Sequence, residues 1–87
     1  DMPSLFKLSI YTPEKTIFDA QVSSLCLPEE GGYLGVLARH APLISTLMPG
    51  KITFKDAEGS LNIVHSAGKG AFEIANNRVI IMLDSAA

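Results

Sequence analysis

Few residues in this sequence could perform chemistry, and they are scattered along the chain. The histidines are His40 and His65, and the only cysteine is Cys26. A structural zinc site usually needs four nitrogen, sulfur or carboxylate ligands, with some of them closely spaced. Because no such spacing occurs, we expect no metal site. Cys26 is interpreted as a buried small hydrophobe, and His65 as a partly buried, hydrogen-bonded strand residue.

Two other segments suggest chemistry but lack the required pattern. Gly68-Lys69-Gly70 resembles a phosphate-binding loop, but a P-loop would need glycine at Ile63 and serine or threonine at Gly70. Glu29 and Glu30 are adjacent, and neighbouring residues of an extended chain point to opposite faces, unlike a glycosidase pair. No G-x-S-x-G nucleophile motif is present. We therefore expect a protein that is not an enzyme, with no cofactor and no catalytic residue.

Size and composition restrict the class of protein further. The 87 residues, with a net charge of −2, predict one domain, 1–87. Nucleic-acid binding usually requires a basic face, so no nucleic-acid partner is expected. No apolar run reaches the roughly 18–20 residues of a membrane-spanning helix. The N-terminus has no signal-peptide pattern, and a single cysteine suits a reducing compartment.

Short strands separated by turn residues predict an all-β fold. Phe6, Leu8 and Ile10 alternate with polar residues, as do Ile52 and Phe54, which is the period of a half-buried strand. The predicted strands are Ser4–Thr12, Thr16–Ala20, Val22–Leu27, Tyr33–Leu37, Leu43–Met48, Lys51–Asp56, Ser60–Ser66, Ala71–Ala75 and Arg78–Asp84. Glycines 68 and 70 predict a bulge or close backbone approach. Only Leu43–Met48 could instead be a helix, of about one and a half turns. This spacing favours an antiparallel sandwich or barrel.

The segment Gly31–Gly50 is the best candidate for a binding surface. Glycine and proline recur through it, which predicts a shaped loop between two strands. Arg39 and His40 lie in that loop, followed by the apolar Leu43 and Ile44, a composition typical of protein–protein hot spots. An ordinary solvated loop explains the composition equally well, so both interpretations stay open.

The same segment resembles the signature of the ε subunit of F-type ATP synthases, and of the homologous mitochondrial δ subunit. The matching positions are Gly32, Leu34, Gly35, Val36, His40, Ala41, Pro42, Leu43, Ile44, Ser45, Leu47, Pro49 and Gly50. The similarity extends over nearly the whole chain, including Phe72-Glu73-Ile74 and the ending Asn77–Ala86.

The resemblance implies an antiparallel β-sandwich of two roughly five-stranded sheets. It also implies a non-catalytic rotor subunit in the central stalk of a proton-transporting ATP synthase, bound to the γ subunit and the c-subunit ring. By position, Arg39, His40, Ala41, Pro42 and Leu43 should face γ and the ring, and Glu29, Glu30 and Tyr33 should lie near polar loops of the ring. Membrane contact would occur only through the complex, at the cytoplasmic face of a bacterial plasma membrane rather than a thylakoid.

Three features depart from the family pattern. Ala38-Arg39 replaces a usual Pro-Gly, and Tyr33 replaces a usual glutamate, so a carboxylate contact to the ring would need Glu29 or Glu30. The sequence ends at Ala87, where the family continues into a helical hairpin, so we expect that hairpin, its inhibition of hydrolysis and its ATP binding to be absent. The alternative is a small β-sandwich ligand-binding module with His40 and His65 in a pocket.

Overall fold

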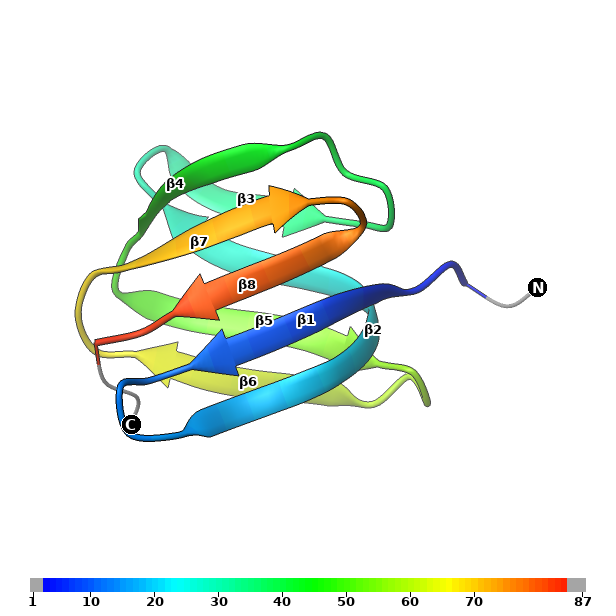
Figure 1. The fold of residues 1–87 in the computed structure, drawn as a ribbon, viewed down its shortest axis with the longest axis horizontal. Helices are drawn as coiled ribbons and strands as arrows, with labels where there is room; N and C mark the ends of the chain where they lie inside the picture. Colours follow the sequence, from blue (N-terminus) through cyan, green and yellow to red (C-terminus); the bar gives the residue numbers. More distant parts are fainter. Residues whose placement is uncertain (1–2, 85–87) are drawn as a thin grey trace.

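The chain is built from β-strands throughout the region that the computed structural model describes, residues 3–84. In chain order they are β1 (Phe6–Tyr11), β2 (Thr16–Glu29), β3 (Gly32–Val36), β4 (Leu43–Leu47), β5 (Gly50–Asp56), β6 (Leu61–Ser66), β7 (Gly70–Ala75) and β8 (Arg78–Met82) (Figure 1). The segment that could have been a helix is strand β4. The described residues include no helix that could cross a membrane. The all-β prediction is confirmed.

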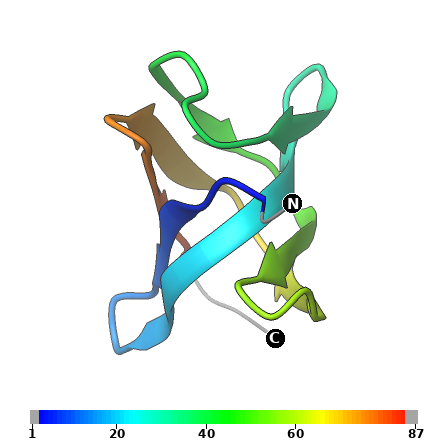
Figure 2. The same cartoon turned by 90° about the vertical axis from the view of Figure 1, so that its right-hand side faces the viewer.

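Strand β2 is the longest, with 14 residues. Two strands were predicted here, but no glycine or proline interrupts the chain from residue 16 to residue 27, so the backbone stays extended. β2 pairs antiparallel with β1 along its first half and with β3 and β5 along its second. A register shift between Val22 and Ser24 bends the strand. β2 therefore crosses from one layer to the other, as Figure 2 shows.

The strands form the predicted sandwich. The alternation of apolar and polar residues does not specify which strands pair. The order is β4-β7-β8-β1-β2-β5-β6, with β3 also paired to β2, so the hydrogen bonding runs through β2 without dividing into two separate sheets. β1 and β8 pair in parallel, with Leu8 beside Val79 and Ile10 beside Ile81. The rest of the pairs are antiparallel.

The core lies between the two layers and is almost wholly aliphatic and phenylalanine. Its buried hydrophobic side chains are Phe6, Leu8, Ile10, Val22, Leu25, Leu27, Val36, Leu47, Ile52, Phe54, Phe72, Ile74, Val79, Ile81 and Leu83. Burial of each contributes roughly 1.5–3 kcal/mol to folding. The alternation predicted for β1 and β5 is confirmed by the burial of its apolar members.

The glycine-rich link between β6 and β7 is a point of close backbone approach. Ser66 Oγ donates a hydrogen bond to the carbonyl oxygen of Gly68 at 2.7 Å. Gly70 begins β7, and a Cβ at this position would overlap the carbonyl oxygen of Met82 in β8. Glycine is therefore required sterically at residue 70, and the predicted close approach is confirmed.

This contact predicts that Gly70→Ala lowers the free energy of unfolding by about 1–3 kcal/mol, the usual cost of overpacking. Gly68→Ala is the matched control, because a Cβ at Gly68 meets nothing within 4 Å. It should shift stability by no more than about 1 kcal/mol. Urea unfolding followed by circular dichroism measures both. Equal effects of the two substitutions would contradict the steric explanation.

Candidate interaction surface

The predicted docking residues lie in two groups at opposite ends of β3. Glu29, Glu30 and Tyr33 surround the β2–β3 turn, and we call them the turn surface. Arg39, His40, Ala41, Pro42 and Leu43 follow the other end of β3, and we call them the loop surface. β3 is about 16 Å long at roughly 3.3 Å per residue, and it runs from the first group, which includes Tyr33 near its start, toward the second. The structure therefore presents two surfaces, not one site.

In the turn surface, the two glutamates have different roles. Glu29 Oε1 accepts a hydrogen bond from the Gly31 amide at 2.9 Å, so this carboxylate closes the turn. The neighbouring Glu30 is exposed, and within residues 3–84 its carboxylate makes no hydrogen bond or ion pair with another residue. Glu30 is thus the carboxylate of this pair that remains open to a partner.

Tyr33 is 60% exposed, and its hydroxyl group lies close to Gly50, the first residue of β5. A Cβ at Gly50 would lie 2.9 Å from the Tyr33 hydroxyl oxygen and 3.3 Å from carbons of Pro28. Gly50 also has a φ of 148°, which side chains disfavour. The aromatic ring is therefore supported by backbone on one side while most of its surface is open to solvent.

The loop surface has a defined backbone shape. Arg39 adopts a φ of 63°, in the left-handed region that costs energy for residues other than glycine. The His40 amide donates to the carbonyl oxygen of Leu37 at 3.3 Å. His40 Nδ1 lies 2.7 Å from the carbonyl oxygen of Ala41, a contact in which Nδ1 must carry the proton. Ala41 and Pro42 are exposed beyond this turn.

One residue outside the predicted set, Asn77, connects the loop surface to the sheet. The Arg39 amide donates to Asn77 Oδ1 at 2.7 Å, and Asn77 Nδ2 donates to the carbonyl oxygen of Leu5 at 2.9 Å. The Lys7 amide donates to the backbone carbonyl of Asn77 at 3.3 Å. The sequence singles out Asn77 only as the first residue of the family-like ending Asn77–Ala86. Its partners are 38 and 72 positions away, so no local pattern indicates them.

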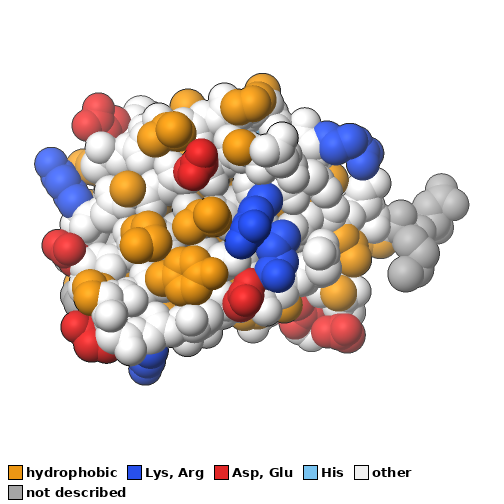
Figure 3. All heavy atoms as spheres, viewed as in Figure 1, with side chains coloured by type: hydrophobic (Ala, Val, Ile, Leu, Met, Phe, Trp, Pro, Cys, Tyr) orange, Lys and Arg blue, Asp and Glu red, His pale blue; other side chains and the backbone are white. Residues whose placement is uncertain are grey.

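Apolar side chains surround the loop surface. Leu37 is 65% exposed, Leu43 36% and Ile44 75%. Figure 3 shows hydrophobic side chains scattered between charged ones on the face of the β4-β7-β8-β1 layer. The free chain therefore exposes apolar side chains near Leu43 and an aromatic one at Tyr33. Exposed leucine and isoleucine beside a loop of fixed shape are available for contact with a protein partner.

The histidines do not form the pocket of the alternative hypothesis. His40 follows one end of β3, whereas His65 pairs with Lys51, near the end of β2 that meets the other end of β3. His65 is also exposed, which corrects the prediction of partial burial. The apolar Leu61 and Ile63 share its face of β6, but that face points outward, and Val64 on the opposite parity packs on the core.

Cys26 is partly buried, not fully buried as predicted. It pairs with Gly35 on β3, which has no side chain to cover it. The result is a shallow hollow of about 370 Å³ whose lining includes Cys26, Gly35, Leu37 and Leu61. Within residues 3–84, no three histidine, cysteine or carboxylate side chains are close enough to share a metal ion.

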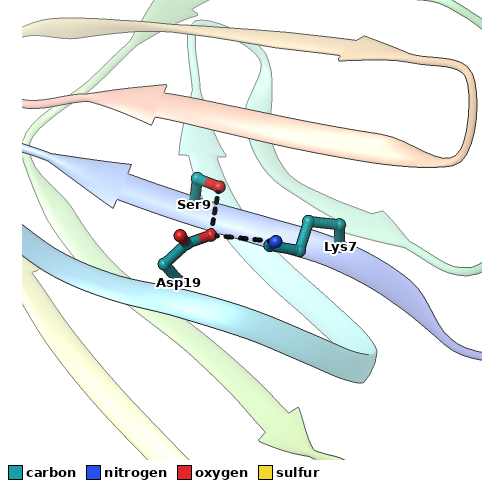
Figure 4. Close-up of polar contacts among 3 residues, drawn as sticks. All are labelled: Lys7, Ser9 and Asp19. Atoms are coloured by element: carbon teal, nitrogen blue, oxygen red, sulfur yellow. Dashed lines mark hydrogen bonds and ion pairs between the residues drawn. The ribbon is translucent and has the colours of Figure 1, made fainter.

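Outside both surfaces, a polar cluster joins β1 to β2 (Figure 4). Ser9 Oγ donates to Asp19 Oδ1 at 2.8 Å, and Lys7 Nζ lies 3.3 Å from the same oxygen. The Ser9 hydrogen bond is the largest effect that holds the pKa of Asp19 below its usual value. Desolvation is the second largest and opposes it, and the hydrogen bond and charge of Lys7 and the charge of Arg78 lower the pKa further. Stabilisation by this carboxylate is therefore present above the unfolded pKa of about 3.9 and is lost as the pH falls through the folded pKa.

A comparison with known proteins defines the class. Over residues 5–87 the sequence matches the β-sandwich domain of the ATP synthase delta/epsilon chain, and the chain belongs to this family. It is 34% identical over 86 residues to the ATP synthase epsilon chain of Dichelobacter nodosus, covering 99% of this chain and 59% of that one. It is 40% identical over 79 residues to that of Moorella thermoacetica, covering 91% and 58%.

A chloroplastic relative and solved structures extend the comparison. The chloroplastic epsilon chain of Cyanidioschyzon merolae is 35% identical over 80 residues, with 92% of this chain and 60% of that one covered. The chain thus spans about 60% of the length of these relatives. A chain in the Euglena gracilis mitochondrial ATP synthase, in an OSCP/F1/c-ring structure, superposes with a TM-score of 0.88 at 20% identity, over 100% of this chain and 55% of that one. This likeness shows the shared fold.

The polar cluster predicts how the Asp19 pKa responds to substitution. Because the Ser9 hydrogen bond is the largest cause of the lowered pKa, Ser9→Ala should move it up toward 3.8. Lys7→Met removes both a hydrogen bond and a charge that lower this pKa, so it should also raise the pKa. Carboxyl carbon NMR titration from pH 2 to 6 measures both variants. An Asp19 pKa that stays unchanged in Ser9→Ala would contradict the role of the Ser9 hydrogen bond.

Proposed function

We propose that this chain is part of a non-catalytic subunit of the central stalk of an F1Fo ATP synthase, which links the γ subunit to the ring of c subunits. Rotation of the ring, driven by ions, would then be coupled to ATP synthesis through the stalk. The observation that carries this proposal is the family match over residues 5–87. The loop surface and the turn surface, exposed at opposite ends of β3, supply places for two partners.

The proposed mechanism is mechanical. A subunit that transmits torque must resist deformation, and close-packed protein interiors do so. The core here is one cluster packed between the two layers. β2 is hydrogen-bonded in both layers, so a load applied at either end of the sandwich is shared by them. The chain's own residues would bind and hold partners, and none would take part in bond making.

In this proposal the loop surface meets γ and the turn surface meets the ring. The loop surface includes exposed Leu43 and adjoins exposed Ile44, which suits a largely apolar protein contact. The turn surface offers the free carboxylate of Glu30 beside the aromatic ring of Tyr33, which suits basic, polar loops. Contact with the membrane would be indirect, through the complex. A bacterial plasma membrane, at its cytoplasmic face, is favoured over a thylakoid because the first relatives found are bacterial.

The γ contact predicts that His40→Asp together with Leu43→Asp reduces retention by γ at least about tenfold, because buried unpaired charges are costly at an apolar interface. Ile44→Asp should act in the same direction without disturbing the core, since its side chain is 75% exposed. The assay is co-purification with γ from the same organism, with folding checked by NMR.

Ile63→Asp is the matched control for these variants. Ile63 is 50% exposed on β6 and lies outside the hollow that Leu37 and Leu61 share, so its variant should bind γ as the wild type does. If all the acidic variants bind normally, the assignment of the loop surface to γ is wrong.

The ring contact predicts that Glu30→Lys weakens attachment of the c-ring several-fold while γ binding is retained, because a repulsive charge replaces an attractive one. Glu58→Lys makes the same charge change in the β5–β6 turn and should leave attachment unchanged. The measurement is the amount of c-ring retained on purified stalk complexes at low and high salt. Loss of attachment with both variants would point to net charge instead of the turn surface.

A further inference from the structure

We propose that Asn77 is the positioning residue of the loop surface: its side chain holds Arg39 in the left-handed conformation that sets the direction of Arg39 and His40. The functional part of this inference rests on the function proposed above. The conformational part depends only on the hydrogen bonds of the free protein.

The geometry assigns this role to the Asn77 amide group because both of its polar atoms are used. Oδ1 accepts from the Arg39 amide at 2.7 Å, a short bond for a neutral amide pair. Nδ2 donates to the carbonyl oxygen of Leu5, immediately before β1. The side chain therefore links the loop after β3, the chain before β1 and the turn before β8. None of these segments is near another in sequence.

Arg39 needs such a constraint. A residue with a Cβ disfavours a φ of 63°, so without a partner for its amide this residue has a strong tendency to rotate into the right-handed or extended region. That rotation would redirect both its own side chain and the following His40. Two other contacts support this conformation, and both are long: the His40 amide donates to the Leu37 carbonyl oxygen across the turn at 3.3 Å, and Arg39 Nη2 lies 3.4 Å from Ser4 Oγ.

The turn itself does not require an asparagine at residue 77. Asn76 and Asn77 occupy the two central positions of the same hairpin turn, with φ values of 54° and 58°, and glycine satisfies both. Asn76→Gly and Asn77→Gly thus make the same backbone change in the same turn. Only the second removes the side chain that bridges Arg39 to Leu5, so their difference isolates the bridge.

The experiment uses the protein at its full natural length in four forms: wild type, Asn76→Gly, Asn77→Gly and Asn77→Asp. The first measurement is amide hydrogen exchange and the proton chemical shift of Arg39 by NMR in the free protein. Asn77→Gly should speed exchange of this amide about three- to tenfold, the effect of losing one hydrogen bond, and shift its proton upfield. Asn76→Gly should leave both unchanged.

Asn77→Asp separates the two halves of the bridge. A carboxylate still accepts from the Arg39 amide but cannot donate to the Leu5 carbonyl. Arg39 should therefore keep its wild-type protection in this variant. If the Arg39 amide is unaffected in Asn77→Gly, or unprotected in Asn77→Asp, the inference is overturned.

The second measurement is the affinity of each form for purified γ from the same organism. Asn77→Gly should weaken it about three- to tenfold, with Asn76→Gly and Asn77→Asp close to wild type. Unchanged γ affinity in a form whose Arg39 amide has lost protection overturns the role of Asn77 in docking. A wild-type protein that does not bind γ at all overturns the proposed function instead, and the amide measurements in the free protein distinguish that result from a failure of the bridge.

Discussion

The fold depends on the hydrogen bonding of β2, which pairs with β1, β3 and β5. Buried backbone groups must be paired, so a strand that passes between layers needs partners along its whole length. β2 finds them by exchanging neighbours near Val22, where the register with β5 shifts and the strand bends. The two layers are therefore held together by backbone hydrogen bonds as well as by side-chain packing.

This arrangement also determines where the exposed surfaces lie. Among the strands of residues 3–84, β3 pairs only with the second half of β2, so its two ends, and the segments attached to them, take their positions from that half. The turn surface and the loop surface are consequently kept at opposite ends of β3, a strand about 16 Å long at roughly 3.3 Å per residue. In the function proposed above, this fixed separation would matter, because flexibility between the two surfaces would absorb part of the rotation.

Local features of the fold could be predicted from the sequence, and long-range ones could not. The burial of Phe6, Leu8 and Ile10 follows from alternation, which depends only on neighbours in the chain. When both faces of a strand carry apolar residues, alternation does not determine which face points inward. For this reason the predicted partial burial of His65 in β6 was wrong. The parallel pairing of β1 with β8 joins segments from opposite ends of the sequence, and no local pattern specifies its direction.

Single residues of the candidate interaction surface show the same difference between features that the sequence predicts and features that depend on long-range contacts. The resemblance to a family placed the residues of the loop and the turn, but it could not rank Glu29 against Glu30, which are identical in type and adjacent. The structure of the turn distinguishes them, because the Glu29 carboxylate accepts a hydrogen bond from the Gly31 amide. Likewise, Asn76 and Asn77 are equivalent as turn residues, and only the approach of Arg39 and Leu5 to one of them gives that asparagine a second role. The structure adds most to the sequence at pairs of this kind, whose two residues are alike in type but differ in their contacts. The same pairs supply the matched variants that test the proposed roles.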